Sequence, residues 1–487
     1  MLSILVCHSY FLHLDQKQVA RAKPYPPLAT LQVVAMLREA GHKVHFFDAM
    51  LAERVEEYDG ILSANQPDLV LFYEDNFNFL SKMCLGAMRD AACQMIGTAR
   101  RAGARVIASG PDVTDSPGPY LRAGTDFALI GEGLAALLEL VPRLEATPGA
   151  PDSELISGLP GIATLNHGHV TTTSGTRIQA IAKDVGLAAW DLIDMEKYRA
   201  VWIKAHGYFS LNMAASRGCP FRCNWCAKPI WGNHYLQRSA TEVAAEMAHL
   251  KRSFRPDHIW FADDIFGFRV DWVIEFAAAA QALDAKIPFT IQTRADLISE
   301  RMAEALRDAG CQEAWLGAES GSQRVLDSMN KGTTVEEILT ARDRLRAVGI
   351  KVGFFIQLGY MDEQLKDILA TRELLENARP DEIGVSVAYP LPGTKFYDLV
   401  KAELRGKTHW KESNDLEMMF HGTYTSEFYR SVRNLLHDQV SLQTGPADYG
   451  ADRERSVRLL ENRWNELLSR EMHYRTPADV VTATAMG

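Results

Sequence analysis

Residues 216–232 read SRGCPFRCNWCAKPIWG and place Cys219, Cys223 and Cys226 within eight positions, in a C-x3-C-x2-C pattern. Thiolates this close together can hold a single metal centre, whereas an iron-sulfur cube usually takes four protein ligands. Three ligands leave one iron with an open coordination position, which distinguishes a reactive metal centre from a structural one. The pattern therefore predicts a reactive iron-sulfur centre in this loop.

A structural zinc site or a disulfide-bonded loop is the alternative interpretation of these cysteines. Closed zinc sites need four ligands, which commonly arrive as two separated pairs, and the sequence has no second pair. His234 follows Cys226 by eight residues and stays open as a fourth ligand. The other cysteines stand singly in apolar segments, where a thiol usually behaves as a small hydrophobe: Cys7, Cys84, Cys93 and Cys311.

Length and composition indicate an intracellular enzyme. A chain of 487 residues is too long for one compact core and suggests two or three domains. The net charge of -10 comes without the basic stripe that nucleic-acid binding requires, so nucleic acid is not an expected partner. The N-terminal MLSILVCHSYF lacks a basic region and a cleavage site, and no apolar run approaches the roughly 20 residues of a membrane span. Seven cysteines without an export signal favour the reducing cytoplasm.

Residues 1–145 alternate β-rich apolar runs with helical stretches, which is the pattern of an α/β, doubly wound and Rossmann-like parallel sheet. Helices are expected at 28–41 and 82–103, each with apolar residues at helical spacing and a glycine, Gly41 or Gly103, at its end. The expected strands are 3–9, 43–49, 68–74, 104–110 and 126–132.

The carboxyl ends of these strands are the predicted ligand site of this domain, because a doubly wound sheet binds its ligand there. Glycine at a strand end lets the backbone approach a bulky ligand, and helix N-termini favour anionic groups. The sequence has no G-x-G-x-x-G and no Walker A segment, which argues against a dinucleotide or ATP. The candidates are His8, Ser9, Asp48, Glu74, Asp75, Asn76, Gly110 to Asp112, Gly131, Glu132 and Gly133.

Residues 146–205 lack sustained periodicity and are interpreted as a linker, in which SGLPGIATLNHGHVTTTSG at 157–175 predicts a small hairpin. Residues 401–487 are amphipathic at helical spacing and predict a helical C-terminal domain. Aromatic residues in this tail, Trp410, Tyr424 and Tyr429, are candidates to line a substrate cavity, although core packing is the more common fate of such side chains.

Residues 206–400 show a second alternation of strands and helices, with strands at 208–214, 258–262, 288–293, 313–318, 351–357 and 382–388. Six units are too few for a complete eight-stranded barrel, so we expect a partial (β/α)6 TIM barrel. Active sites of such barrels lie at the carboxyl ends of the strands. Cys311 precedes the fourth strand and is therefore expected on the opposite rim from the cysteine loop. The rim candidates are Asp263, Asp264, Arg294, Glu319, Ser320, Gln357 and the segment YPLPGT at 389–394.

The cysteine motif and these rim segments resemble the radical SAM superfamily, in which the three cysteines hold a four-iron four-sulfur cluster and S-adenosylmethionine (SAM) chelates the open iron. The resemblance implies that Cys219, Cys223 and Cys226 are the cluster ligands and that Trp225 shields the cluster near the adenine. It also implies SAM contacts from FADDIF at 261–266, TRADL at 293–297, LGAESGS at 316–322 and FFIQLGY at 354–360, through Asp263, Asp264, Arg294, Glu319, Ser320 and Gln357.

The order of sheet domain, DLIDMEKY at 191–198, cysteines and YPLPGT resembles the cobalamin (B12)-dependent branch of this superfamily, over residues 2 to about 400. That branch includes C-methyltransferases and the anaerobic Mg-protoporphyrin monomethyl ester cyclase. The resemblance implies cobalamin contacts from Asp48, Glu74, Asp75, Asn76, Gly110, Gly131, Glu132 and Gly133. The sequence departs from many cobalamin proteins because it has no D-x-H-x-x-G. The loop 74–76 is then the candidate for the lower face of the cofactor, unless the domain has kept its fold and lost the cofactor.

The activity implied by the resemblance is reductive cleavage of SAM to a 5'-deoxyadenosyl radical, which takes a hydrogen atom from an unactivated carbon of a small-molecule substrate, followed by C-methylation. Oxidative cyclisation or radical rearrangement without net methylation is the alternative reaction. An external electron donor such as flavodoxin or ferredoxin is the implied partner. A non-catalytic iron-sulfur protein for electron transfer or assembly is the alternative from another functional class.

Overall fold

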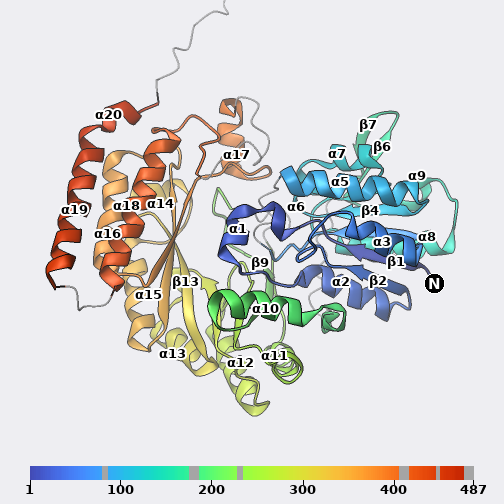
Figure 1. The fold of residues 1–487 in the computed structure, drawn as a ribbon, viewed down its shortest axis with the longest axis horizontal. Coiled ribbons are helices and arrows are strands. Elements are labelled where there is room, and N and C mark those ends of the chain that lie inside the picture. Colours follow the sequence, from blue (N-terminus) through green and yellow to red (C-terminus); the bar gives the residue numbers. More distant parts are fainter. Residues whose placement is uncertain (79–85, 175–185, 227–233, 405–415, 446–449, 477–487) are drawn as a thin grey trace, which may run out of the picture.

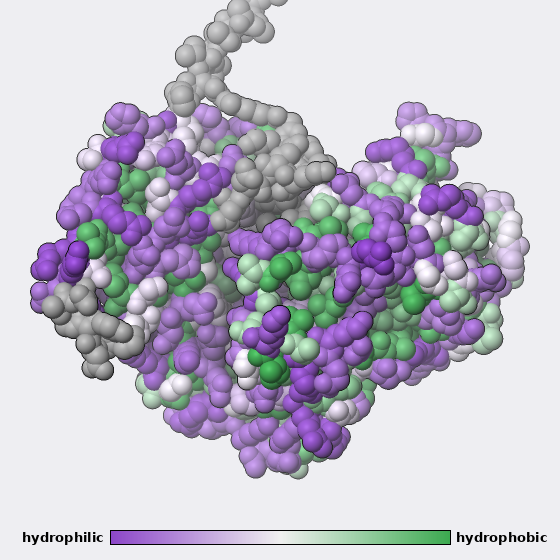
Figure 2. All heavy atoms as spheres, in the orientation of Figure 1, coloured by the Kyte–Doolittle hydropathy of each residue, from purple (hydrophilic) through white to green (hydrophobic). Residues whose placement is uncertain are grey.

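The computed structural model describes residues 1–78, 86–174, 186–226, 234–404, 416–445 and 450–476. Figure 1 shows two α/β units side by side, with the C-terminal helices on the outer side of the second unit. Hydrophilic residues cover most of the face shown in Figure 2, over both units. Within the described ranges, no helix is long and apolar enough to cross a membrane.

The first unit is built on a seven-stranded sheet with the strand order β2-β1-β3-β4-β5-β6-β7. The first five strands run parallel, as predicted, and their order reverses between β1 and β3. Such a reversal opens a crevice at the carboxyl ends of the two central strands. The strands are β1 Ser3–Cys7, β2 Lys43–Phe47, β3 Leu69–Tyr73, β4 Arg105–Ser109, β5 Phe127–Leu129, β6 Ile162–Asn166 and β7 His169–Thr172.

Helices cover both faces of this sheet (Figure 1). The two predicted helices are confirmed as α2 and α5, and Gly41 and Gly103 follow them with φ of 86° and 87°, a conformation that glycine adopts without strain. The helices are α1 Gln16–Arg21, α2 Leu28–Glu39, α3 Glu57–Asn65, α5 Gly86–Arg101, α6 Pro111–Asp115, α7 Pro117–Ala123, α8 Leu134–Ala146 and α9 Asp152–Leu155, with the 3-10 turns η1 Leu12–Leu14 and η2 Trp190–Leu192.

The hairpin predicted within the connecting segment is present as β6 and β7, but it belongs to the first sheet. β6 pairs antiparallel with β5, with Ala163 opposite Ala128, and β7 pairs antiparallel with β6. Ile162 and Ala163 are fully buried, because this apolar start of β6 covers the edge that β5 would otherwise expose. The first sheet therefore continues past residue 145 to Thr172, while the domain boundaries at residues 145, 205 and 400 stay predictions.

The second unit is a six-stranded parallel sheet in the order β15-β14-β13-β12-β11-β8, which confirms the predicted partial barrel. Its strands are β8 Ser210–Met213, β11 His258–Phe261, β12 Phe289–Thr293, β13 Cys311–Glu319, β14 Lys351–Leu358 and β15 Glu382–Val387. The helices around it are α11 Ala240–Phe254, α12 Val270–Ala282, α13 Glu300–Ala309, α14 Gln323–Ser328, α15 Val335–Ala347, α16 Leu365–Ala378 and α17 Lys395–Val400, with the 3-10 turns η4 Ala295–Leu297 and η5 Lys401–Glu403.

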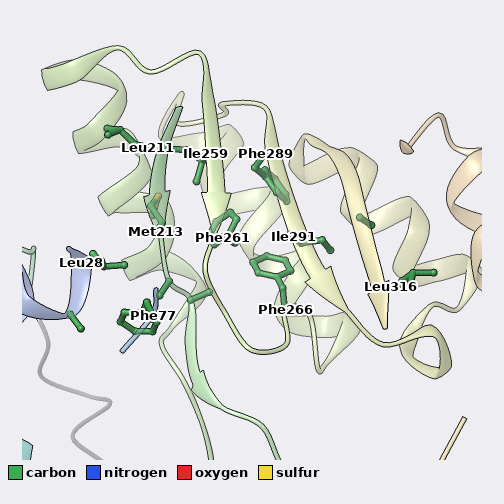
Figure 3. Close-up of a cluster of buried hydrophobic side chains, with 14 of the residues drawn as sticks. Leu28, Phe77, Leu211, Met213, Ile259, Phe261, Phe266, Phe289, Ile291 and Leu316 are labelled. Atoms are coloured by element: carbon green, nitrogen blue, oxygen red, sulfur yellow. The ribbon is translucent and has the colours of Figure 1, made fainter. Parts of the chain in front are cut away.

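One face of the second sheet is buried against its helices. Ile259 and Phe261 on β11 and Phe289 and Ile291 on β12 point to the same side in Figure 3 and are fully buried. The Phe261 ring also packs on those of Phe266, Phe276 and Phe289 at centroid distances of 4.7 to 5.9 Å. Aromatic packing of this kind stabilises a core beyond the area that it buries.

The two units contact each other through α10, Met195–His206. Tyr198 on this helix donates a hydrogen bond to Asp48 after β2, at 2.8 Å, and the Trp202 indole donates to the Pro24 carbonyl at 2.7 Å. At the other end of the molecule, α18 Ser426–Thr444 packs on β15 and α16, and it is followed by α19 Gly450–Ser469 and α20 Glu471–Tyr474. Tyr424 and Tyr429 are fully buried, and Trp410 lies outside the described residues.

Candidate cofactor site

The cysteine loop leaves the carboxyl end of β8 through a small antiparallel sheet that sequence reasoning missed. Its strands are β9 Ser216–Gly218 and β10 Tyr235–Gln237, and Gly218 pairs with Tyr235 on either side of the loop. Asn224 fixes the middle of the loop, because its backbone N–H donates to the Met329 carbonyl and its side chain donates to the Ser328 carbonyl, both at 2.9 Å. The carboxyl end of α14 therefore holds the loop at the rim of the barrel.

The three cysteines lie in this one loop, with Cys219 buried and Cys223 and Cys226 half-buried, and none of them forms a disulfide bond. Among the residues described, no three or more His, Cys, Asp or Glu side chains are grouped so that they could hold a metal ion. The three cysteines are thus close in the sequence, but in the described structure their sulfurs do not form a group of metal ligands. His234 is exposed at the start of β10.

Two buried cations lie beside Cys223. A guanidinium nitrogen of Arg294 is 3.7 Å from the Cys223 sulfur, and the guanidinium carbon lies 3.7 Å from the centre of the Phe221 ring. The ammonium of Lys331 is 6.0 Å from the centre of the Trp225 ring. Burial by itself would lower the pKa of Lys331, but the charges of Glu319 and Cys223 raise it instead. Two positive charges thus lie close to the proposed cluster ligand Cys223.

Lys331 is the rim residue that the sequence did not reveal, and it pairs with the predicted Glu319 at 2.8 Å. The Lys331 side chain is 6% exposed and the Glu319 side chain 5%. Gly317 makes room for them, because an added Cβ would lie 2.5 Å from the Lys331 nitrogen. Glu319 itself has a φ of 60°, at an irregularity where β13 meets β14. A non-glycine residue in this conformation stores strain of the kind found at functional sites.

Two predicted rim residues have internal partners. Both carboxylate oxygens of Asp263 accept hydrogen bonds from the segment before the cysteines, one from the Ala215 N–H at 3.0 Å and one from the Ser216 hydroxyl. Burial and the nearby Asp264 raise the pKa of Asp263 to about 7. The Ser320 hydroxyl is bonded to that of Thr371 at 3.2 Å. These residues shape the rim, and half-buried Asp264 lies beside Asp263 in the sequence.

Two of the predicted rim residues each have a buried polar atom with no hydrogen-bond partner within the described ranges. The two atoms are the side-chain oxygen of Gln357, a residue that is 5% exposed at the end of β14, and the indole nitrogen of Trp225. Unsatisfied buried polar groups are rare in folded proteins and cost free energy. Trp225 lies in the cysteine loop, and Gln357 follows Ile356, which is in register with Glu319. These positions fit a polar ligand that would satisfy the two atoms.

Glu363 is a further rim residue that the sequence did not reveal. One oxygen accepts from the Gly359 N–H at 2.6 Å, directly after β14, and the other has no partner in the part of the chain that is described. Burial raises the pKa of Glu363 to about 8, with Asp367 adding to the rise and the Gly359 N–H opposing it. The carboxyl group is therefore largely protonated at neutral pH.

This raised pKa predicts a pH-dependent stability. The wild type has its largest advantage in unfolding free energy over a Glu363→Gln variant below pH 4.5, the ordinary pKa of a glutamate side chain. It loses this advantage as the pH rises through about 8. We expect the difference in melting temperature to move in favour of the variant by about 2 °C or more between about pH 5 and about pH 9. Thermal unfolding of both proteins at both pH values measures this. Glu304→Gln, at an exposed position, should show no such change, and a pH-independent difference for Glu363→Gln would contradict the assignment.

At the first sheet, the strand ends converge on the crevice between β1 and β3. The Glu74 carboxylate after β3 accepts hydrogen bonds from the Ser9 N–H at 2.9 Å and the Ser9 hydroxyl at 2.7 Å, after β1. Gly110, after β4, has a φ of 151°, and an added Cβ would lie 2.7 Å from the Cβ of Glu74. Burial raises the pKa of Glu74. Glycine is therefore required at position 110 to accommodate the Glu74 side chain.

The neighbouring candidates differ in what remains available to a ligand. Asp75 caps α2 by accepting from the Ala29 N–H at 3.0 Å, and Asp48 accepts from Tyr198. Asn76 is fully buried, and neither its oxygen nor its nitrogen has a hydrogen-bond partner among the described residues. Asn76 is thus the strand-end candidate whose polar atoms are unsatisfied. Of the others, Gly131 donates to the Thr114 hydroxyl at 3.0 Å, and Gly133 precedes α8 with a φ of 71°.

Glu132 forms an ion pair with Arg217, which lies on β9 two residues before Cys219. Arg217 also donates to the Gln32 side chain on α2 and lies over the Phe77 ring, 5.5 Å from its centre. Burial raises the pKa of Glu132, although Arg217 opposes the rise. The strand ends of the first sheet are therefore connected directly to the cysteine loop of the second unit.

Cys311 begins β13 and is buried, whereas Glu319 ends the same nine-residue strand at the rim. Its predicted place on the opposite rim is confirmed. We expect Cys311→Ala to keep the iron content of the wild type after anaerobic reconstitution, as measured by iron and sulfide analysis. A large loss of iron in this variant, with the protein still folded by circular dichroism, would show that Cys311 takes part in the metal site.

Residues 213–404 match the family model described as the Radical SAM superfamily. An uncharacterized methyltransferase of Pyrococcus horikoshii is 27% identical over 77% of this chain and 78% of the relative. An anaerobic magnesium-protoporphyrin IX monomethyl ester cyclase of Rubrivivax gelatinosus is 26% identical over 56% of this chain, and the chain spans about half of that relative, 48%.

Two solved structures share the fold over most of the chain. The radical S-adenosylmethionine methyltransferase TsrM from Kitasatospora setae, with cobalamin and a 4Fe-4S cluster bound, has a TM-score of 0.68 and 18% identity over 84% of this chain and 79% of its own. The cobalamin-dependent S-adenosylmethionine radical enzyme OxsB, with aqua-cobalamin and S-adenosylmethionine bound, has a TM-score of 0.70 and 16% identity over 97% of this chain and 75% of its own. Residues 213–404 thus form a radical SAM superfamily domain, within a chain that has the fold of the cobalamin-dependent radical SAM enzymes.

Proposed function

We propose that this protein is a cobalamin-dependent radical SAM methyltransferase that methylates a carbon atom of a small molecule. The observation that carries the proposal is the rim around the C-x3-C-x2-C loop, where two buried cations lie near Cys223 and predicted rim residues have unsatisfied polar atoms. The ion pair of Arg217 with Glu132 also brings the strand ends of the first, doubly wound sheet against this rim.

Cys219, Cys223 and Cys226 would hold the 4Fe-4S cluster, because three thiolates in one loop can bind three of its irons and leave the fourth iron open to SAM. When bound, the cluster supplies the electron that cleaves SAM to methionine and a 5'-deoxyadenosyl radical. Arg294, 3.7 Å from the Cys223 sulfur, contributes positive charge that offsets the charge of the thiolates. An external donor such as flavodoxin or ferredoxin would deliver the electron.

SAM would be held by the Glu319–Lys331 pair, Trp225, Gln357 and Asp264. The methionine part of SAM carries an ammonium and a carboxylate, and a buried carboxylate–ammonium pair can bind both of them by exchanging its own contact for theirs. The unsatisfied atoms of Gln357 and Trp225 would bond the polar groups of the ligand. Asp263 and Ser320 position this rim through their bonds to Ser216 and Thr371.

Cobalamin would lie over the strand ends of the first sheet, against Asp48, Glu74, Asp75, Asn76, Gly110, Gly131 and Gly133. When bound, it supplies the methyl group that is transferred to the substrate. The unsatisfied amide of Asn76 fits a contact with this cofactor, whereas Glu132 is engaged by Arg217 and serves the connection between the units.

The test is anaerobic reconstitution followed by incubation with SAM, a reductant and a panel of small molecules. We expect 5'-deoxyadenosine to form and the visible spectrum to show both a cluster and bound cobalamin. Absence of 5'-deoxyadenosine from protein with a full complement of iron would contradict the proposal.

Cyclisation without net methylation is the second candidate, favoured by the similarity to the anaerobic cyclase. SAM labelled in its methyl carbon separates the two reactions, because a methyltransferase passes the label to its product. A non-catalytic iron-sulfur protein would have no use for a buried ion pair and unsatisfied polar atoms beside its cluster, and SAM binding in an anaerobic titration excludes it.

A further inference from the structure

The two faces of the barrel sheet differ in their accessibility. Along β11 to β14, the residues that face the helices are buried, whereas several of the alternate residues are only half-buried. Since successive side chains of a strand point to opposite faces, these half-buried residues line the inside of the partial barrel. They are Trp260, Gln292, Trp315 and Phe355 and, nearer the amino ends of the strands, His258 and Glu313. Barrels of this type usually fill their interior with packed side chains, so an accessible inner face indicates space for a ligand.

Trp315 and Phe355 form a stacked aromatic pair on this inner face. Their rings are stacked, with centroids 4.8 Å apart and an angle of 29° between the planes. Two glycines on neighbouring strands make room for them. A Cβ added at Gly353 would lie 2.5 Å from the Trp315 ring, and one added at Gly384 would lie 3.3 Å from Phe355 and 3.4 Å from Trp315. The indole therefore lies against the backbone of β14, which turns its other face away from the sheet.

Below this aromatic layer, the barrel is closed by a chain of hydrogen bonds. Ser210 is bonded to His258 at 2.9 Å, His258 to Thr290 at 2.9 Å, and Thr290 donates to Glu313 at 3.2 Å. Tyr25, from the first unit, is bonded to Ser210 at 3.1 Å. Burial lowers the pKa of His258 to about 4, with Lys23 adding to the effect, so this layer stays neutral at His258 and its polar groups are satisfied.

Beside and above the aromatic layer lie two buried side-chain amide oxygens that accept no hydrogen bond from the described residues. Gln357 lies two residues beyond Phe355 on the same face of β14, and Asn212 is the register partner of Trp260. Their residues are 5% and 3% exposed, and neither side-chain oxygen has a hydrogen-bond partner within the described ranges. These oxygens can accept only from an N–H or O–H group.

We propose that this inner face binds a flat, unsaturated ring of the substrate that carries an N–H or O–H donor. Trp315, Phe355 and Trp260 would recognise the ring by stacking, and Asn212 would accept its hydrogen bond, while Gln357 at the rim above serves SAM. The half-buried positions of this aromatic layer, Trp260, Gln292, Trp315 and Phe355, carry no formal charge. This inference rests on the proposed function for the chemistry at the rim above, and it adds the class of substrate.

The experiment compares benzamide with cyclohexanecarboxamide, which share an amide donor and differ in having a flat or a puckered ring. Binding of each to the full-length protein is followed by ligand-observed saturation-transfer NMR. Aromatic contacts add to affinity beyond the area buried, so we expect benzamide to bind about fivefold more tightly. Equal affinities of the two compounds for the wild type would overturn the proposal.

Two variants locate the binding, and one serves as their control. Trp315→Leu removes the indole, and Gly384→Ala keeps both rings but adds a methyl group at 3.3 to 3.4 Å from them. We expect both variants to lose the preference for benzamide. Phe254→Leu, a half-buried position on α11, should keep it. A preference that survives in both barrel variants would place the binding elsewhere and overturn the proposal.

The outcome is separable from that of the proposed function. Protein that cleaves SAM to 5'-deoxyadenosine but shows no ring preference would refute this inference alone. Protein that shows the ring preference, lost in Trp315→Leu, supports the inference even where no 5'-deoxyadenosine forms, and the proposed reaction would then be the part refuted.

Discussion

Cys223→Ala is expected to remove the iron-sulfur cluster and with it all SAM cleavage. Cys223 has two neighbouring cations, one of them a guanidinium nitrogen at 3.7 Å, and a cube that already has only three protein ligands is not held by two. Iron and sulfide analysis after anaerobic reconstitution, together with the loss of the broad visible absorption, measures the effect. Formation of 5'-deoxyadenosine should fall to background.

A matched variant controls for the loss of any cysteine. Cys93 is half-buried on α5 of the first unit, so Cys93→Ala removes a thiol of similar exposure far along the chain from the loop. It should bind iron and cleave SAM like the wild type. Retention of a full cluster in Cys223→Ala would show that this cysteine is not a ligand, and the proposed function would lose its basis.

Lys331→Met is expected to have the second largest effect, on both stability and SAM binding. The variant leaves the Glu319 carboxylate, which is 5% exposed, without its partner at 2.8 Å. Removing one member of a buried ion pair typically costs about 3–5 kcal/mol. We expect the free energy of unfolding to fall by about that amount in denaturant titrations, and SAM binding in an anaerobic titration to fall by about 100-fold or more.

A double variant separates the two roles of this pair. Lys331→Met combined with Glu319→Gln leaves no unpaired charge, so most of the lost stability should return. SAM binding should stay weak, because neither the carboxylate nor the ammonium is restored. If the double variant bound SAM like the wild type, the pair would be a structural element of the rim and would have no part in holding the ligand.

The parallel strands could be predicted from the sequence because each is an apolar run that is buried on at least one face. KVGFFIQ and DLVLFYE, for example, correspond to β14 and β3 within a residue or two. For β6 and β7 the sequence predicts only a hairpin in a connecting segment, since a short hairpin has no local property that distinguishes a free ribbon from the edge of a sheet. The pairing of Ala163 with Ala128 depends on residues 35 positions apart.

Site residues could be predicted where their position along a strand determines that they lie at the rim. They could not be predicted where contacts between residues distant in the sequence determine it. Glu319 and Gln357 follow from the rule that barrel sites lie at strand ends. Lys331 lies beyond a short helix in the run SMNKGTT, and nothing local indicates that it reaches Glu319. Asp263 shows the converse, because its strand-end position does not reveal that Ala215 and Ser216 occupy both of its oxygens.

The ion pair between Arg217 and Glu132 has a consequence for how the proposed cobalamin would enter the protein. The two side chains are 10% and 9% exposed, and opening a hinge between the units would break this pair and the hydrogen bonds of Tyr198 and Trp202, and would expose these two buried rings to water. We therefore expect the two halves to swing apart rarely once the chain has folded. Cobalamin would then bind while the chain is still folding. Protein folded without it should bind cobalamin slowly, and a mild denaturant that weakens the contact between the two units should speed the binding.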